Sequence, residues 1–196
     1  MGTLESSRVE VGPGDALLIV DVQNDFMPGG ALGVTDGDEI VPLVNHLVRQ
    51  FHALRLPIIF SRDWHPEAHC SFVEQGGPWP PHCVQGSSGA QFCPAVHVPE
   101  DAIVVSKATD VEEEAYSAFQ GTGLDVLLDQ KGVSRLLIVG LATDYCVLAS
   151  ARDALERGLE IVVLEEGVRA VNVRPDDGQR ALQELRKSGA QILRAA

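Results

Sequence analysis

Short apolar runs alternate with amphipathic segments along most of the chain. The runs are rich in Val, Ile and Leu and are continuous, which is typical of strands that are buried on both faces. They predict six strands, at residues 16–20, 57–61, 102–106, 135–139, 160–164 and 190–193. Segments with apolar residues at helical spacing predict helices at residues 40–54, 124–131, 144–157 and 176–188. This alternation indicates an α/β fold in which helices cover both faces of a parallel sheet.

The composition fits one globular domain that spans residues 1–196, with residues 1–14 expected to be a poorly ordered N-terminal arm. Of the residues, 45% are hydrophobic, so the chain can bury a sizeable core. The 15 basic and 28 acidic residues give a net charge of −13. Such a charge repels phosphate groups, and it argues against nucleic acid or an anionic membrane as a partner.

The expected location is the cytoplasm. No apolar run approaches the roughly 20 residues that span a bilayer. Residues 1–14 lack the apolar stretch of a secretory signal. Without such a signal, the four cysteines are better explained as free thiols, metal ligands or a nucleophile than as disulfides.

Cys146 occupies the most informative position among these cysteines. It follows the predicted strand at residues 135–139 and lies where a helix begins, with Thr143 or Asp144 as the candidate capping residue. A thiol in the first turn of a helix lies near the positive end of the helix dipole, which favours the thiolate. The alternative is a structural cysteine that only packs in this turn.

Three other chemical groups also follow predicted strands. The residues at or just past the four strand ends are Asp21, Asp63, Lys107 and Cys146. In open parallel sheets, ligands bind beyond the carboxyl ends of the strands. A cysteine hydrolase needs a nucleophile, a proton acceptor and a charge that holds them, and Cys146, Asp21 and Lys107 can supply these. Taken singly, Asp21 could be a turn residue and Lys107 a solvated strand end, but their convergence favours catalysis.

A possible metal site follows the second predicted strand. Asp63 and His65 lie two residues apart on extended chain and therefore point the same way. The Gly- and Pro-rich turn at residues 76–81 can bring His82 back as a third ligand. Such a set suits zinc, manganese or iron and leaves positions open for water or substrate. His69 could be a fourth ligand or a hydrogen-bonding neighbour of the ligands.

Two irregular segments, residues 63–99 and 108–123, are long for loops in a compact domain and are therefore expected to be functional. They contain Trp79 and Tyr116, and Phe26 follows the first predicted strand. These aromatic side chains could wall a small flat ligand or could simply pack in the core.

Five stretches of the chain resemble the nicotinamidases of the isochorismatase-like cysteine hydrolase superfamily. The stretches are residues 18–34, 61–72, 76–92, 106–124 and 137–147, which include LIVDVQNDF, SRDWHPEAH, GGPWPPHC, SKATD and LIVGLATDYCV. The aspartate, lysine and cysteine are motifs of the whole superfamily. The Asp-Trp-His and Trp-Pro-Pro-His blocks are specific to the nicotinamidase branch.

The resemblance implies a three-layer α/β/α sandwich around a six-stranded parallel sheet. It implies a catalytic triad of Asp21, Lys107 and Cys146. The implied metal ligands are Asp63, His65 and His82, with zinc as the expected ion and manganese or iron as alternatives. The implied walls of the ring pocket are Phe26, Trp79 and Tyr116.

The resemblance also implies an oxyanion hole made by the backbone N–H groups of Ala142 and Cys146, with a cis peptide bond between Leu141 and Ala142. The implied reaction is metal-dependent deamidation of nicotinamide to nicotinate and ammonia through a cysteine thioester, in NAD salvage. Pyrazinamide is the expected second substrate. Another amidohydrolase of the superfamily, or a binding protein that has kept the fold, are the alternatives. The resemblance leaves the oligomeric state open, and a homo-oligomer is compatible with it.

Overall fold

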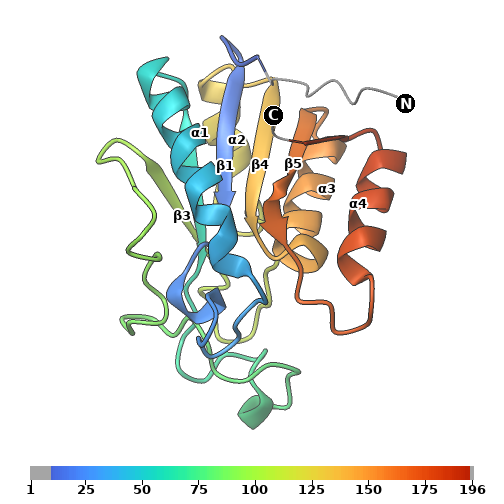
Figure 1. The fold of residues 1–196 in the computed structure, drawn as a ribbon. Helices are drawn as coiled ribbons and strands as arrows, with labels where there is room; N and C mark the ends of the chain where they lie inside the picture. Colours follow the sequence, from blue (N-terminus) through green and yellow to red (C-terminus); the bar gives the residue numbers. More distant parts are fainter. Residues whose placement is uncertain (1–9, 195–196) are drawn as a thin grey trace.

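The computed structural model describes residues 10–194. Within them, six parallel strands form one sheet in the order β3-β2-β1-β4-β5-β6 (Figure 1). The strands are β1 Asp15–Val20, β2 Ile58–Asp63, β3 Ile103–Lys107, β4 Arg135–Leu141, β5 Glu160–Arg169 and β6 Gln191–Leu193. Each predicted strand is present. Of the arm predicted at residues 1–14, residues 1–9 lie outside the described part of the chain.

Helices cover the two faces of the sheet. They are α1 Val41–Ala53, α2 Leu124–Gln130, α3 Leu148–Glu156 and α4 Asp177–Lys187. Alternate residues of β1 face opposite layers: Leu17 packs in the core under α1, and Leu18 packs in the core under the other three helices. Both side chains are fully buried. This two-sided burial explains why the strand sequence is continuously apolar and does not alternate with polar residues.

Two elements differ from the sequence-based expectation. The fifth strand was predicted to end at residue 164, but β5 continues to Arg169 and pairs with the end of β4. The pair Glu165-Glu166 interrupts the apolar run, although the backbone remains extended through it. The helix predicted at residues 144–157 begins instead with a π-helical turn, Thr143–Val147, which leads into α3.

The irregular segments gather beyond the carboxyl ends of the strands, at the lower end of the sheet in Figure 1. Short 3₁₀ turns, Asn24–Phe26, Gly37–Ile40 and Val73–Gln75, are the helical pieces here. Isolated β-bridges join His65 to Val84 and Phe72 to Trp79. The long loops are therefore tied to one another at the edge where parallel sheets bind ligands. None of the helices in residues 10–194 has the length and apolar character to cross a membrane.

Candidate active site

Asp21, Lys107 and Cys146 form a buried cluster at the carboxyl ends of three strands. The Lys107 Nζ lies 3.0 Å from Asp21 Oδ2 and 3.4 Å from the Cys146 sulfur. It also contacts Asp63 Oδ1. All four side chains are shielded from solvent. One ammonium group thus joins the candidate nucleophile to two carboxylates.

The charge on Lys107 is retained in spite of its burial. Burial by itself disfavours the ammonium form, but Asp21 and Asp63 outweigh it and raise the pKa of Lys107 well above the ordinary value. The lysine therefore stays protonated. Burial also raises the pKa of Asp21, against the opposing effect of Lys107. A carboxylate with a raised pKa is a stronger proton acceptor, which suits a general base.

The expectation that the surroundings of Cys146 favour the thiolate is wrong. Burial raises the pKa of the Cys146 thiol well above its ordinary value, and the charge of Lys107 only partly opposes the shift. The nearby carboxylates of Asp21 and Asp63 raise it further. The thiol proton must therefore be removed as the sulfur attacks, and the neighbouring carboxylate of Asp21 is placed to accept it.

The capping expectation for Thr143 and Asp144 is also wrong. The residue before the π-helical turn is Ala142, and no side chain caps the turn. The two carboxylate oxygens of Asp144 accept hydrogen bonds from the backbone N–H groups of Val171 and Asn172, at 2.9 and 2.8 Å. Asp144 therefore ties the turn that holds Cys146 to the loop after β5.

Asp63, His65 and His82 bring one ligand atom each to within 4.8 Å of one another. The Nδ1 atoms of His65 and His82 lie 3.0 and 2.8 Å from backbone carbonyl oxygens. A carbonyl only accepts, so each Nδ1 carries the proton and each Nε2 keeps a free lone pair. Burial lowers the pKa of His65 to about 3, which keeps this ring neutral. One carboxylate and two imidazole nitrogens fit a divalent cation.

His69 lies beside this set but uses both ring nitrogens. Its Nδ1 accepts a hydrogen bond from the backbone N–H of Ser71 at 3.3 Å, which assigns the proton to Nε2. The Nε2 then donates to the Glu113 carbonyl oxygen at 3.1 Å. The ring stacks 4.3 Å from that of His65. In this arrangement His69 packs against a possible ligand and offers no lone pair of its own.

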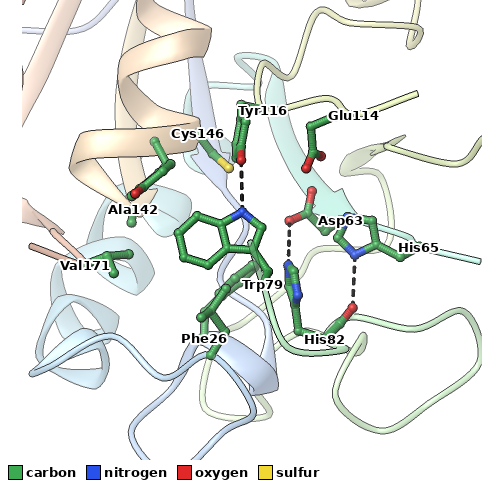
Figure 2. A pocket seen from close by; sticks show the side chains of 12 residues that line it. Phe26, Asp63, His65, Trp79, His82, Glu114, Tyr116, Ala142, Cys146 and Val171 are labelled. Carbon is green, nitrogen blue, oxygen red and sulfur yellow. Dashed lines mark hydrogen bonds and ion pairs between the residues drawn. The ribbon is translucent and has the colours of Figure 1, made fainter. Parts of the chain in front are cut away.

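The three aromatic residues named from the sequence line one pocket, together with Cys146 and the possible metal ligands (Figure 2). The indole N–H of Trp79 donates to the Tyr116 hydroxyl at 2.9 Å. Burial raises the pKa of Tyr116 to about 12, so the phenol remains neutral. Phe26 lies edge-on to His82, with ring centroids 5.6 Å apart. These contacts surround a mainly apolar pocket beside the thiol.

Sequence reasoning missed other residues of the pocket wall. Tyr145 packs edge-on against Trp79, with ring centroids 5.1 Å apart, and also touches Tyr116. Tyr145 directly precedes Cys146 in the sequence, and this position could have identified it as a residue of the pocket wall. Glu114 also lines the pocket, and its carboxylate lies within 4.8 Å of ring nitrogens of His65 and His69. No pattern in the polar segment around Glu114 distinguishes it from its acidic neighbours.

Two buried polar side chains, which were also missed, hold the two aspartates in place. The Ser61 hydroxyl donates to Asp21 Oδ1 at 2.7 Å. The amide of Gln23 both donates to the carbonyl oxygen of Asp63 and accepts from its N–H, at 2.8 Å each. A polar residue within an apolar strand, such as Ser61, was the available sequence signal.

The backbone at the end of β4 has the expected form. The peptide bond between Leu141 and Ala142 is cis, as predicted. One residue earlier, Gly140 has a φ of +122°, and a Cβ there would lie 2.1 Å from the carbonyl oxygen of Val20. Only glycine fits this close approach of β4 to β1. Ala142 and Cys146 both line the pocket that follows.

A family comparison accounts for this combination of sheet, cysteine and loops. The Isochorismatase domain matches residues 15–196. The chain belongs to the isochorismatase family. Among its relatives, the nicotinamidase of Escherichia coli (strain K12) is 39% identical over 201 residues, which cover 92% of this chain and 94% of that protein.

Solved structures of the isochorismatase family match the whole fold. The pyrazinamidase of Pyrococcus horikoshii, in complex with zinc, has a TM-score of 0.89 and 50% identity over 93% of this chain and 99% of that one. PnC1 from L. infantum, in complex with nicotinate, has a TM-score of 0.88 and 38% identity over 95% and 96% of the two chains. The expected family and sandwich architecture are therefore confirmed.

Proposed function

We propose that this protein is an amidohydrolase that converts nicotinamide to nicotinate and ammonia, with pyrazinamide as a second substrate. The observation that carries the proposal is the buried Asp21–Lys107–Cys146 cluster, which opens on an aromatic pocket. The named relatives support this choice of substrate, because they are a nicotinamidase, a pyrazinamidase and a protein with bound nicotinate.

Asp63, His65 and His82 would hold a divalent metal, for which zinc is the first candidate and manganese or iron are alternatives. When bound, the metal offers an electrophilic position to the ring nitrogen of nicotinamide. Phe26, Trp79 and Tyr116 contact the faces and edge of the pyridine ring and exclude water from it. Together these contacts orient the carboxamide toward Cys146, and orientation of this kind lowers the barrier to attack.

The first half of the reaction forms a thioester. Asp21 takes the thiol proton as the Cys146 sulfur attacks the carboxamide carbon. The backbone N–H groups of Ala142 and Cys146 donate to the oxygen of the tetrahedral intermediate. Asp21 then returns the proton to the amide nitrogen, the C–N bond breaks, and ammonia leaves. Lys107 keeps its positive charge throughout and stabilises the ionised forms of both partners.

The second half of the reaction releases the acid. Asp21 takes a proton from a water molecule while the water oxygen attacks the thioester carbon. The C–S bond breaks, the sulfur regains its proton from Asp21, and the nicotinic acid so formed loses its own proton to solvent and leaves as nicotinate. One amide bond has been hydrolysed, and each residue has returned to its starting protonation state.

Measurement of ammonia release tests the proposed function. The purified protein should release ammonia from nicotinamide and pyrazinamide, and a chelator should abolish this activity until zinc is added back. Carbamoyl amides and isochorismate serve as comparison substrates. Preference for a carbamoyl amide would identify a different amidohydrolase of the family, and no turnover of nicotinamide or pyrazinamide would overturn the proposed function.

The context of the reaction follows from the same assignment. Nicotinate formation would serve NAD salvage in the cytoplasm. The match of the family model to residues 15–196 supports the proposal that the chain is a single domain. Assembly into a homo-oligomer is compatible with the structure, and light scattering of the purified protein measures it directly.

A further inference from the structure

A buried serine hydroxyl contacts the proposed general base from outside the pocket. Ser61 lies on β2, and its Oγ donates to Asp21 Oδ1 at 2.7 Å. Both side chains are 0% exposed, so bulk solvent does not reach the contact between them. Ser61 does not line the pocket around Cys146. It therefore contacts the base but is not placed to contact the substrate.

The register of the sheet fixes the relative positions of the two residues. In the parallel pairing of β1 with β2, Val20 lies opposite Ser61. The backbone N–H of Asp21 then donates to the Ser61 carbonyl oxygen at 3.2 Å. Asp21 and Ser61 are thus joined through both the main chain and the side chains. The second contact restricts rotation of the carboxylate group.

The two oxygens of Asp21 consequently differ. Oδ1 is occupied by the Ser61 hydroxyl, whereas Oδ2 has no hydrogen-bond donor among the described residues. Lys107 lies 3.0 Å from Oδ2 and forms an ion pair with it, but the pair does not have hydrogen-bond geometry. The same ammonium group lies 3.4 Å from the Cys146 sulfur. Oδ2 is therefore the oxygen available to accept a proton on the side of Lys107 and the thiol.

We propose that Ser61 is a positioning residue whose hydroxyl fixes the Asp21 carboxylate so that Oδ2 accepts the proton of Cys146. This inference rests on the proposed role of Asp21 as the general base. Loss of the hydroxyl leaves Oδ1 buried without a donor, and the carboxylate can then turn away from the thiol or take up a proton itself. Ser61 thereby acts on the rate of the chemical steps without contributing to nicotinamide binding.

Three variants separate this role from general loss of structure. Ser61→Ala removes the hydroxyl, and Ser61→Thr retains it on a residue that suits a strand. Ser106→Ala is the matched control, because Ser106 lies on the neighbouring strand and its hydroxyl accepts a hydrogen bond from Arg62. Arg62 follows Ser61 on β2 and so points to the opposite face of the sheet. Ser61→Cys, which keeps the side-chain volume but offers only a weak donor, replaces Ser61→Ala if the alanine variant does not fold.

Two measurements are made on the zinc-loaded protein. The first is kcat and KM for ammonia release from nicotinamide. The second needs no substrate: the rate of alkylation of Cys146 by iodoacetamide, followed by peptide mass spectrometry. Ser61→Ala should lower kcat about 10-fold, as expected for loss of a hydrogen bond to a charged group, with KM and zinc content unchanged. It should also shift the rate of alkylation of Cys146 in the same direction as Asp21→Asn, because both changes disturb the carboxylate that faces the thiol.

Ser61→Thr should restore both rates to within about twofold of the wild type, and Ser106→Ala should match the wild type, because each keeps the Asp21 contact. The proposal is overturned if Ser61→Ala retains both wild-type rates, or if it raises KM with kcat unchanged. If the wild-type protein releases no ammonia from nicotinamide, the proposed function fails. The alkylation rates still decide in that case whether Ser61 acts on Cys146 through Asp21.

Discussion

The ammonium group of Lys107 lies 3.4 Å from the Cys146 sulfur, and both side chains are buried. Without this cation, the carboxylates of Asp21 and Asp63 would face each other and the thiol with no compensating charge. The lysine is therefore as important for the integrity of the site as for the reaction.

Replacement of Lys107 by Met should lower both activity and stability. Removing one partner of a buried ion pair typically costs about 3–5 kcal/mol, because the other charge is left uncompensated. We also expect kcat/KM to fall at least about 100-fold, since proton transfer by Asp21 depends on the ion pair. Urea unfolding and ammonia release measure the two effects. Lys131→Met, at an exposed position after α2, is the control and should change neither.

Replacement of Cys146 by Ala should abolish turnover. The three other cysteines lie outside the Asp21–Lys107–Cys146 cluster, so Cys70→Ala, Cys83→Ala and Cys93→Ala should retain most of the activity. Iodoacetamide should inactivate the enzyme in step with labelling of Cys146, which peptide mass spectrometry detects. Substantial ammonia release by Cys146→Ala would exclude the thioester mechanism.

Replacement of His82 by Ala should reduce metal content and raise KM for nicotinamide. His82 offers its free Nε2 beside Asp63 Oδ2, at 4.0 Å, so its loss removes one of three ligands. His69→Ala should retain most of the metal, because both nitrogens of His69 are already hydrogen-bonded. His46→Ala, at an exposed position on α1, is the matched control. Metal analysis by mass spectrometry would contradict the assignment if His82→Ala kept a full equivalent of zinc.

The sequence predicted the sheet well because a strand that is buried on both faces has a continuously apolar sequence. Leu17 and Leu18 point to opposite cores, so the run around them contains no polar residue. The end of β5 was missed for the opposite reason. Gly140 and Leu141 of β4 pair with Val168 and Arg169, and this pairing keeps β5 extended beyond its acidic residues.

The predicted strand ends and the family resemblance were enough to name most of the residues that line the site. The carboxyl ends of β1, β3 and β4 brought Asp21, Lys107 and Cys146 together. Contacts between distant segments could not be inferred: Asp144 was expected to cap its own helix, but its partners are Val171 and Asn172. The thiol's pKa was misjudged because it depends on burial and on neighbouring carboxylates, which only the folded chain brings close.

The rate of ammonia release should fall on acidification at a pH above 3.8, the ordinary pKa of an aspartic acid. Burial raises the pKa of Asp21 despite the opposing charge of Lys107. In the proposed mechanism Asp21 accepts the thiol proton, which requires the ionised carboxylate. Activity is therefore present at pH values above the raised pKa and is lost as pH falls through it. A profile of kcat/KM against pH measures this, and an acidic limb at or below 3.8 would contradict it.

The raised pKa has the opposite consequence for folding. A carboxyl that holds its proton more tightly in the folded than in the unfolded chain favours folding most at low pH. Its contribution then declines as pH rises from 3.8 through the raised value. Unfolding of the wild type and of Asp21→Asn, compared across this pH range, isolates that contribution.

Replacement of Gly140 by Ala should destabilise the fold strongly. A Cβ at this position would lie 2.1 Å from the Val20 carbonyl oxygen and 2.5 Å from the Val20 nitrogen, and neither backbone atom can move without parting β4 from β1. The φ of +122° adds to the cost, because it is far from the conformations that alanine prefers. Gly132→Ala is the matched control, since Gly132 has a φ of +65° but no atom within 4 Å of the added Cβ.

Gly132→Ala should lower the free energy of unfolding by about 1–2 kcal/mol, the usual cost of a left-handed residue that is not glycine. Gly140→Ala should cost several kcal/mol more, because steric overlap with the central strand is added to the same backbone cost. Urea unfolding of both variants measures the difference. Equal midpoints would mean that β4 can shift to admit a side chain, and the close approach of β4 to β1 would then not require glycine.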